Sequence, residues 1–443
     1  MEVNQLRLHI EDFRAIKEAD IILNGITVVA GENGSGKSTL SKFLYYAFQN
    51  SIEYDELVDK DLKNKLNPFL SFIDDFDRTV FTGTTNRLKD RLVVPDLVHD
   101  NPLLSIYDRY QDETYLLKKI DRLFSSYESE KQHIDSAKIV RLKFILQSIL
   151  EERTTHESNL SYLKDRLKQT IHRYFEEAKD YREKRPLFFF TDELNRIFST
   201  GLLPSNYRIT EYESSIINNT DDILERAYTI HQTAYIDTPM LLGHTGEDHW
   251  NRINTILYNR DTTENYNSFL NAIISREIIK GEVSVENKYS GIMDAFVYKR
   301  EDGTRFNLLE CATGIKSFAI LQMLLKNGFL NKYTLLIIDE PEAHLHPQWI
   351  VEFARLIVLL NKHIGVKFFI ASHDPDIVAA IKYIGEKEEI DNNLNFYFSQ
   401  KEDNSFTYTY QHLGTDIGPI FESFNIAFDK INQYSDTQEN NEE

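Results

Sequence analysis

Hydrophobic and polar positions alternate at the start of the chain and then change to a helical spacing. Residues 6–13 (LRLHIEDF) alternate apolar and polar side chains, which is the period of a half-buried strand. Asn24-Gly25 marks a turn before the apolar run of residues 26–30, and residues 40–48 have helical apolar spacing. The pattern therefore predicts a buried strand, a glycine-rich loop and a helix, in that order.

The middle of the chain is predicted to be mostly helical. Residues 50–112 have a mixed pattern with loop signals, whereas residues 113–185 contain no proline or glycine. Apolar residues recur there at three- and four-residue steps, and the polar stretch EERTTHES interrupts them, so we expect two helices of about 30 residues in an antiparallel hairpin. The pattern of residues 186–290 predicts mainly helices with loops. The recurring positions are Leu142, Ile145, Ile149, Leu160, Leu163, Leu167, Ile171 and Tyr174.

The last third of the chain alternates predicted strands and helices. Two alternating runs flank Asp302-Gly303, which is a strong hairpin signal. A helix (316–326), a strand (333–338), a helix (348–360) and a strand (366–371) follow, and residues 393–411 predict a final hairpin. This order predicts an α/β fold with a mixed sheet and flanking helices.

Composition excludes several classes of protein. No apolar run reaches 18 residues, so no transmembrane helix and no membrane partner are expected. The charged N-terminus lacks the layout of a signal peptide. The single cysteine, Cys311, excludes an internal disulfide and fits a reducing compartment, so we expect a cytoplasmic protein.

The charge balance bears on partners. A net charge of −20 repels nucleic-acid phosphates, so any DNA or RNA binding requires a local basic patch. Residues 118–185 hold 16 Lys/Arg against 12 Asp/Glu and are therefore locally basic. Two interpretations stay open for this stretch: a solvated helical face, or a surface that contacts nucleic acid or a protein.

A glycine-rich loop matches the phosphate-binding pattern G-x-x-x-x-G-K-[ST] at residues 31–38 (GENGSGKS). Its glycines let backbone N–H groups converge on phosphate oxygens, and the following helix N-terminus adds positive potential. Lys37 is expected to reach the β- and γ-phosphates, and Ser38 to coordinate Mg²⁺. The pattern thus predicts ATP with Mg²⁺, held by Gly31, Asn33, Gly34, Ser35, Gly36, Lys37, Ser38 and Thr39.

Two later strands end in candidate catalytic side chains. Asp339 follows the apolar run 335–338 and is expected to hold Mg²⁺, while Glu340 is placed to accept a proton from the attacking water. His373 follows the apolar run 368–371 and is expected to bond the γ-phosphate or the water, the alternative being a polar surface histidine. Lys37, Glu340 and His373 form the predicted catalytic set.

These segments resemble the ATP-binding heads of the ABC superfamily, in the branch that holds RecF, Rad50, SMC and OLD-type ATPases. DEPEAHLHPQ (339–348) is typical of the OLD-like group, as is the N-terminal motif Asp12-Phe13-Arg14. Arg14 is expected either to touch nucleotide, as in relatives, or to be a surface arginine. No glutamine is assigned to the Q-loop of the family.

The resemblance also implies a signature motif in ECATGIKSFAI. Thr313 and Gly314 occupy its Ser-Gly positions, although Thr replaces Ser and Ile315-Lys316 depart from the family pattern. In the family this helix start contacts ATP bound by another subunit. The resemblance therefore implies a homodimer or higher homo-oligomer joined through ATP-bridged heads.

The same resemblance divides the chain into parts of one ABC-ATPase head and an insertion. Residues 1–49 carry the glycine loop, and residues 291–430 carry the signature motif, the acid pair and His373. Residues 50–290 form a largely helical insertion with a short antiparallel coiled-coil hairpin at about 113–185. Residues 431–443 are polar and acidic, and predict a disordered tail.

The resemblance further suggests a biological role. Only 70 residues follow His373, they are expected to form a hairpin, a helix and a tail, and they carry no Cys/His nuclease pattern, so we expect no nuclease within the chain. An OLD-like ATPase of this kind resembles the ATPase subunit of bacterial antiphage systems such as Septu or PARIS. It would regulate a separate nuclease or toxin effector, triggered by nucleic acid or a phage-encoded product. The alternatives are a RecF/Rad50-like DNA-repair ATPase acting directly on DNA, a transporter ATPase and an ATP-switched scaffold.

Overall fold

A computed structural model describes residues 6–81, 112–132, 134–151, 159–199, 202–244, 246–258, 267–288, 293–343 and 345–422. The chain divides into two compact units. The first combines residues 1–52 with residues 190–443, and the second, helical unit comprises residues 53–189. The tail expected at 431–443 lies outside the described residues.

Within the described residues, the first unit contains a ten-stranded mixed sheet in the order β5-β4-β1-β2-β13-β12-β3-β11-β10-β6. Strands β12, β3, β11, β10 and β6 run parallel, whereas β1 pairs antiparallel with β2 and β4. The strands of this sheet are β1 (Arg7–Phe13), β2 (Ile16–Ile22), β3 (Ile26–Ala30), β4 (Asn206–Glu211), β5 (Ser214–Asn218), β6 (Gln232–Ile236), β10 (Thr334–Asp339), β11 (Lys367–Ser372), β12 (Leu394–Lys401) and β13 (Tyr408–Gly414).

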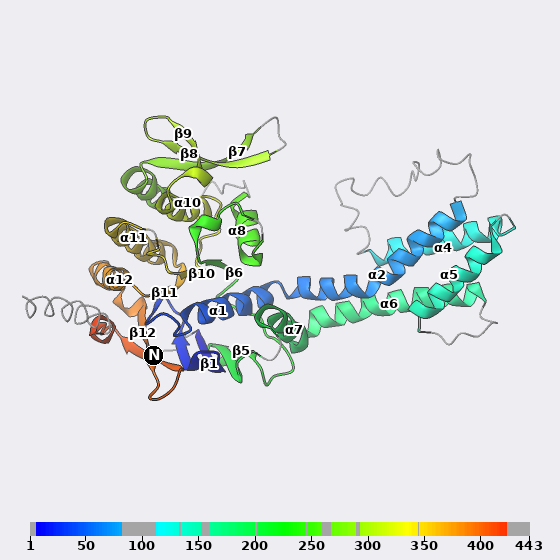
Figure 1. Cartoon of the computed structure of the whole chain (residues 1–443), viewed down its shortest axis with the longest axis horizontal. Coiled ribbons are helices and arrows are strands. Elements are labelled where there is room, and N and C mark those ends of the chain that lie inside the picture. Colours follow the sequence, from blue (N-terminus) through cyan, green and yellow to red (C-terminus); the bar gives the residue numbers. More distant parts are fainter. Residues whose placement is uncertain are drawn as a thin grey trace, which may run out of the picture. The chain divides into compact units, whose positions relative to one another are not determined.

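Helices cover both faces of the parallel strands. Helix α1 contacts β6, β10 and β11, whereas alternate strand residues such as Leu336 and Ile338 join a core cluster with α10, α11 and α12. Every residue of β3 is buried, because strands covered on both faces need apolar side chains on both. The expected α/β class is thus confirmed (Figure 1). The helices are α1 (Lys37–Ile52), α8 (Asp248–Tyr258), α9 (Ser268–Ala272), α10 (Thr313–Lys326), α11 (Pro347–Ile364) and α12 (Pro375–Lys387).

The two helices that follow β10 and β11 begin and end at clear sequence signals. His346 caps α11 by accepting from the Gln348 N–H, and Gly365 ends that helix with φ at 85°. Asp374 caps α12 by accepting from the Asp376 N–H at 2.7 Å. Both helices carry proline in the first turn, where the missing N–H has no intrahelical partner to lose.

The segment 190–290 differs from the mostly helical insertion expected there. It supplies β4, β5 and β6 to the large sheet, and β7 (Gly281–Lys288) to a three-stranded sheet with β8 (Met293–Arg300) and β9 (Arg305–Asn307). Strands β4, β5 and β6 have only five or six residues and leave little period to detect, so their partners decide their conformation. The expected hairpin around Asp302-Gly303 is confirmed as β8–β9.

The second unit consists, in its described part, of α2 (Tyr54–Phe81), α4 (Glu113–Glu130), α5 (Ser136–Ile149), α6 (Leu160–Lys184) and the start of α7 (Leu187–Phe198). Helix α2 was not expected from the mixed pattern of 50–112. Its proline, Pro68, removes one backbone donor from the helix and is exposed, as is Asn64 one turn earlier. The buried positions nevertheless recur at helical steps: Tyr54, Val58, Leu62, Leu66, Phe69, Phe72, Ile73, Phe76 and Val80.

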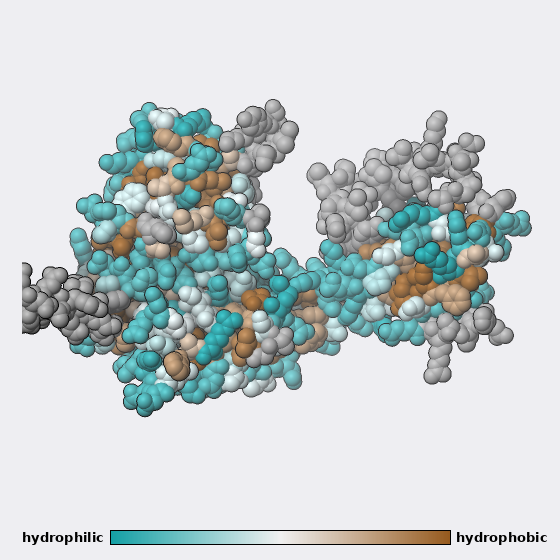
Figure 2. All heavy atoms as spheres, viewed as in Figure 1, coloured by the Kyte–Doolittle hydropathy of each residue, from teal (hydrophilic) through white to brown (hydrophobic). Residues whose placement is uncertain are grey.

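Helix α6 packs along α2 and also against α4 and α5. Phe69 and Tyr174 form an edge-on ring contact with ring centroids 6.0 Å apart, and Lys65 pairs with Glu177 at 3.6 Å. Residues 113–185 therefore contain three helices, α4, α5 and α6, rather than the two-helix hairpin expected there, and α2 packs against all three. On the face drawn in Figure 2, apolar side chains gather on this unit, and Val140, Phe144 and Tyr162 are about half exposed.

Among the described residues, no helix combines the length and apolarity required to cross a bilayer.

Candidate functional site

The parallel strands bring three segments of the sequence to one edge of the sheet. Strand β11 lies between β3 and β10, and all three run parallel. Their carboxyl ends lead into the glycine loop after Ala30, into Glu340 after Asp339, and into His373 after Ser372. Ligands of open α/β sheets bind at such carboxyl ends. The three predicted segments therefore meet in one region.

The glycine loop rests closely on neighbouring strands. Gly31 has φ at 154°, and a Cβ atom there would lie 1.7 Å from Ser399 Oγ of β12. Gly36 has φ at 97°, and its Cβ would lie 2.7 Å from Ile16. The Tyr410 hydroxyl of β13 donates to the Ser35 carbonyl oxygen at 3.0 Å. These contacts require glycine and hold the loop in a conformation that exposes Asn33, Gly34 and Ser38, while Thr39 is half-buried in the first turn of α1.

Lys37 begins α1 and turns its side chain back onto the loop. Its Nζ atom donates to the carbonyl oxygens of Gly31 and Glu32, both at 2.8 Å. Burial lowers the pKa of Lys37, and the nearby carboxylates of Asp339 and Glu340 oppose that shift. A buried ammonium group bonded only to neutral carbonyls is well placed to exchange them for anionic oxygens.

Asp339 ends β10 in a buried position. Its Oδ2 accepts a hydrogen bond from the Tyr235 hydroxyl at 3.1 Å, and Ser38 also bonds to this carboxylate. Within the described residues, Oδ1 has no hydrogen-bond partner although it is buried. Burial raises the pKa of Asp339, and the bonds from Ser38 and Tyr235 offset part of that rise. A carboxylate with a free oxygen beside a hydroxyl group fits the oxygen ligands that Mg²⁺ prefers.

Three side chains meet beyond the ends of β10 and β11. His373 Nδ1 lies 3.4 Å from Glu340 Oε1 and 3.3 Å from Glu342 Oε1. Glu340 and His373 are 43% and 42% exposed, whereas the Glu342 side chain is only 4% exposed. Burial raises the pKa of Glu342, and hydrogen bonds from His373 and Ser372 oppose the rise. The predicted acid and the predicted histidine are therefore neighbours that solvent reaches.

Thr313 and Gly314 lie at the start of α10. Ala312 precedes the helix and makes no side-chain cap, so the first-turn N–H groups have no capping side chain. Gly314 is buried, and a Cβ atom there would lie 2.6 Å from the ring of Trp349. Among the described residues, no hydrogen bond or ion pair joins this helix start to the glycine loop or to residues 339–373. Within one chain, the described part of the structure thus shows no polar contact between the helix start and the glycine loop or the ends of β10 and β11.

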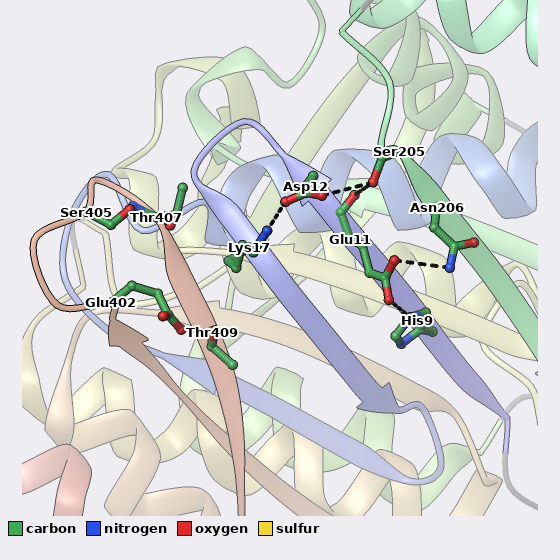
Figure 3. Close-up of polar contacts among 10 residues, drawn as sticks. All are labelled: His9, Glu11, Asp12, Lys17, Ser205, Asn206, Glu402, Ser405, Thr407 and Thr409. Atoms are coloured by element: carbon green, nitrogen blue, oxygen red, sulfur yellow. Dashed lines mark hydrogen bonds and ion pairs between the residues drawn. The ribbon is translucent and has the colours of Figure 1, made fainter.

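The motif Asp12-Phe13-Arg14 covers the last two residues of β1 and the first residue of the turn to β2. Figure 3 shows Asp12 between Lys17, at 2.5 Å, and the Ser205 hydroxyl, at 3.3 Å. Phe13 is fully buried against Phe43 of α1, with ring centroids 5.6 Å apart. Arg14 is exposed and donates to the Phe198 carbonyl oxygen at 3.3 Å. Phe13 therefore anchors the helix that follows the glycine loop.

Several residues of this region were missed by sequence reasoning. Tyr235 lies in a strand that was expected to be helical or loop, and Ser399 and Tyr410 lie in the expected last hairpin without any expected role. Glu342 follows the acid pair closely, but nothing in its spacing distinguishes a buried carboxylate from an exposed one. Only tertiary packing brings these four side chains to the site.

The burial of Asp339 predicts that Asp339→Asn raises the free energy of unfolding of the nucleotide-free protein by about 1 kcal/mol. The folded-state pKa of this carboxyl is raised, so its ionisation costs stability as pH rises above the unfolded pKa of about 3.9. The gain should therefore be larger at about pH 7.5 than at about pH 4.5. Thermal unfolding followed by circular dichroism measures it.

Asp403→Asn serves as a matched control, because Asp403 is exposed in the turn between β12 and β13. Its effect should stay within about 0.5 kcal/mol at both pH values. Equal stability of Asp339→Asn and the native chain at neutral pH would contradict the assigned burial cost.

Comparisons with protein families and with solved structures find proteins similar to this chain. A family model described as AAA ATPase domain (AAA_15) matches residues 1–378. The SMC head domain from Thermotoga maritima is 10% identical, and the match covers 92% of this chain and 98% of that chain with a TM-score of 0.34. An Smc head domain with an extended coiled coil, bound to the C-terminal domain of ScpA and derived from Pyrococcus furiosus, is 11% identical, with coverages of 97% and 99% and a TM-score of 0.35.

A search of curated proteins found no significant match. The family match, and not the low structural scores, decides the assignment, since it spans most of the chain. The chain therefore belongs to the AAA ATPase domain family and is a P-loop ATPase.

Proposed function

We propose that this ATPase hydrolyses ATP in composite sites between two heads, and that the ATPase cycle regulates a separate effector protein. The observation that carries the first part is the meeting of Lys37, Asp339, Glu340 and His373 at one edge of the parallel sheet. The second part rests on the resemblance to OLD-like ATPases of antiphage defence and is an analogy at the level of the fold.

The glycine loop supplies the phosphate-binding half of the proposed site. Backbone N–H groups of residues 31–39 and the N-terminus of α1 would bind the phosphates of ATP. Lys37 would exchange its bonds to the Gly31 and Glu32 carbonyls for phosphate oxygens. Ser38 and Asp339 would hold Mg²⁺, which supplies positive charge at the phosphate oxygens. The free Oδ1 of Asp339 supports this assignment.

Glu340 is proposed to accept the proton of the attacking water. Its backbone N–H donates to the Ala371 carbonyl at 2.8 Å, which fixes the residue at the end of β10, while its carboxylate stays partly exposed to water. A general base must reach the water whose proton it takes. His373 lies beside this carboxylate and is proposed to orient it together with the γ-phosphate.

The start of α10 is proposed to complete the site of another copy of the chain. Its first-turn N–H groups have no capping side chain, which favours an anion as partner. In the part of the chain that the structure describes, Thr313 and Gly314 make no hydrogen bond to the glycine loop of their own chain. A homodimer or higher homo-oligomer with ATP between the heads would supply the missing contact.

The helical unit is the proposed contact for the effector, a nuclease or toxin in a bacterial antiphage system. Val140 and Phe144 lie one turn apart on α5 and are half exposed, which supports a docking role. An alternative is direct action on DNA, as in RecF- or Rad50-like ATPases. This alternative is favoured by a hollow of about 240 Å³ between α2 and α5, whose lining contains three basic side chains and one acidic side chain. The lining residues are Asp75, Arg78, Thr79, Lys138, Arg141, Leu142 and Ile145.

The proposed base predicts that Glu340→Gln lowers ATP turnover about 10²- to 10⁴-fold while ATP binding is retained. The ATP-bound dimer should persist longer, because hydrolysis no longer separates the heads.

Lys37→Ala should instead weaken ATP binding about 10- to 100-fold, since a charge-assisted bond to phosphate is lost. Phosphate release, nucleotide titration and light scattering after size exclusion measure these effects. Turnover of Glu340→Gln at the native rate would remove Glu340 from the proposed role.

Composite sites predict complementation between two inactive variants. Lys37→Ala damages the loop half of a site, and Thr313→Glu places a negative charge at the helix start that would face the phosphate. Each variant alone should be inactive, whereas their mixture should regain part of the turnover, because one site of a mixed dimer has two native halves. A mixture of Lys37→Ala with Glu340→Gln should regain nothing, since both changes affect the same half. Equal turnover of the two mixtures would argue against shared sites.

The regulatory role predicts a stable complex with the product of the adjacent gene. Co-expression should yield a co-purifying protein, and protection from phage infection should require both proteins and Glu340. The DNA-binding alternative predicts instead salt-sensitive DNA binding and DNA-stimulated ATP turnover, both reduced by Lys138→Ala with Arg141→Ala. A chain that purifies alone and leaves infection unchanged would exclude the proposed role.

A further inference from the structure

One buried carboxylate connects the end of β10 with the end of β11. Glu342 Oε1 accepts a hydrogen bond from the Ser372 hydroxyl at 2.8 Å and another from the His373 backbone N–H at 3.0 Å. The same oxygen lies 3.3 Å from His373 Nδ1. A single oxygen atom therefore contacts both the backbone and the ring of the histidine.

A sharp turn brings Glu342 to this position. Glu340 adopts a positive φ of 50°, which non-glycine residues rarely do, and its N–H bonds the Ala371 carbonyl of β11. The Ala343 N–H then bonds the Glu340 carbonyl at 2.9 Å. The chain thus reverses directly after Asp339, and the side chain of Glu342 points back between the two strand ends.

The contacts of Ser372 extend the connection to the next helix. Its hydroxyl donates to Glu342 and accepts from the Asp374 N–H at 3.0 Å. Asp374 in turn caps α12. The path of the chain from β11 through His373 into α12 therefore depends on the carboxylate of Glu342.

Glu342 is unsuited to act on water itself. Its side chain is 4% exposed, whereas those of Glu340 and His373 are each more than two-fifths exposed. Its second oxygen, Oε2, is also buried and has no hydrogen-bond partner within the described residues. A carboxylate enclosed in this way acts on the reaction only through the groups that it holds.

We propose that Glu342 is a positioning residue, which fixes the backbone and the ring of His373 beside Glu340 for ATP hydrolysis. This inference rests on the proposed function, in which Glu340 and His373 carry the chemistry. Glu342 sets the distance between the two by accepting hydrogen bonds from the His373 backbone N–H and the Ser372 hydroxyl on an oxygen that lies 3.3 Å from His373 Nδ1, and it makes no contact with the phosphates.

The test is the hydrolysis of ATP by Glu342→Gln. Glutamine keeps the size and one acceptor oxygen but loses the negative charge, so its bonds to His373 and Ser372 are weaker. We expect kcat to fall about 10- to 100-fold, as is typical when a supporting partner is lost, while KM for ATP stays within about twofold. The double variant Glu342→Gln with His373→Ala should be no slower than His373→Ala alone, since Glu342 acts through the histidine.

Two further variants guard against effects on folding. Glu352→Gln makes the same change on α11, where the carboxylate contacts Arg355 and not the site, and it should retain native kcat and melting temperature. Ser372→Ala keeps the carboxylate but removes one donor to it, so it should lower kcat less than Glu342→Gln does. If Glu342→Gln fails to fold, native kcat in Ser372→Ala would overturn the proposal.

The outcomes separate the two proposals. Native kcat in Glu342→Gln, or losses that multiply in the double variant, would overturn the role of Glu342 while leaving Glu340 as the base. A native chain that releases no phosphate, or whose turnover does not depend on Glu340, would overturn both proposals.

Discussion

The parallel pairing of β3, β11 and β10 is the constraint on which the site depends. In this register Ala30 lies opposite Ser372, and Ala371 lies opposite Asp339. The glycine loop, Glu340 and His373 therefore all begin within one residue of each other along the strand direction. Because side chains alternate between the faces of a strand, a shift of one residue would turn Asp339 away from Lys37 and Ser38. Hydrogen bonds of the backbone thus set the geometry of the catalytic side chains.

Burial of charge is the second constraint at this edge. Lys37, Asp339 and Glu342 are each at most 6% exposed. Burial lowers the pKa of the lysine and raises the pKa of both acids, because it disfavours the charged form of each side chain. Their opposite charges offset part of this cost. Buried charged side chains with shifted pKa values are common where a protein binds a charged ligand. Buried charge seldom adds to the stability of the fold by itself.

The helical unit follows a simpler rule, which is the burial of one apolar stripe on each helix. Leu163, Leu167 and Ile171 of α6 are fully buried, as their three- and four-residue spacing predicts. The same spacing is present in α2, but the proline and the charged residues between its apolar positions concealed it. The spacing of apolar residues shows that a helix has a buried face. It does not show which other helix covers that face, because the packing of the whole unit decides this.

The sequence by itself determined the α/β class, the glycine loop, the acid pair and the final strands, because these depend on local patterns of apolar, glycine and acidic residues. It did not determine the strands between residues 206 and 236, since short strands acquire their conformation from their partners. The same limit applies to Tyr235, Glu342, Ser399 and Tyr410, whose neighbours lie between 30 and 375 residues away along the chain. Only the tertiary structure decided which acid is buried and which is exposed to water. Burial depends on all surrounding elements together, and no local pattern of residues encodes it.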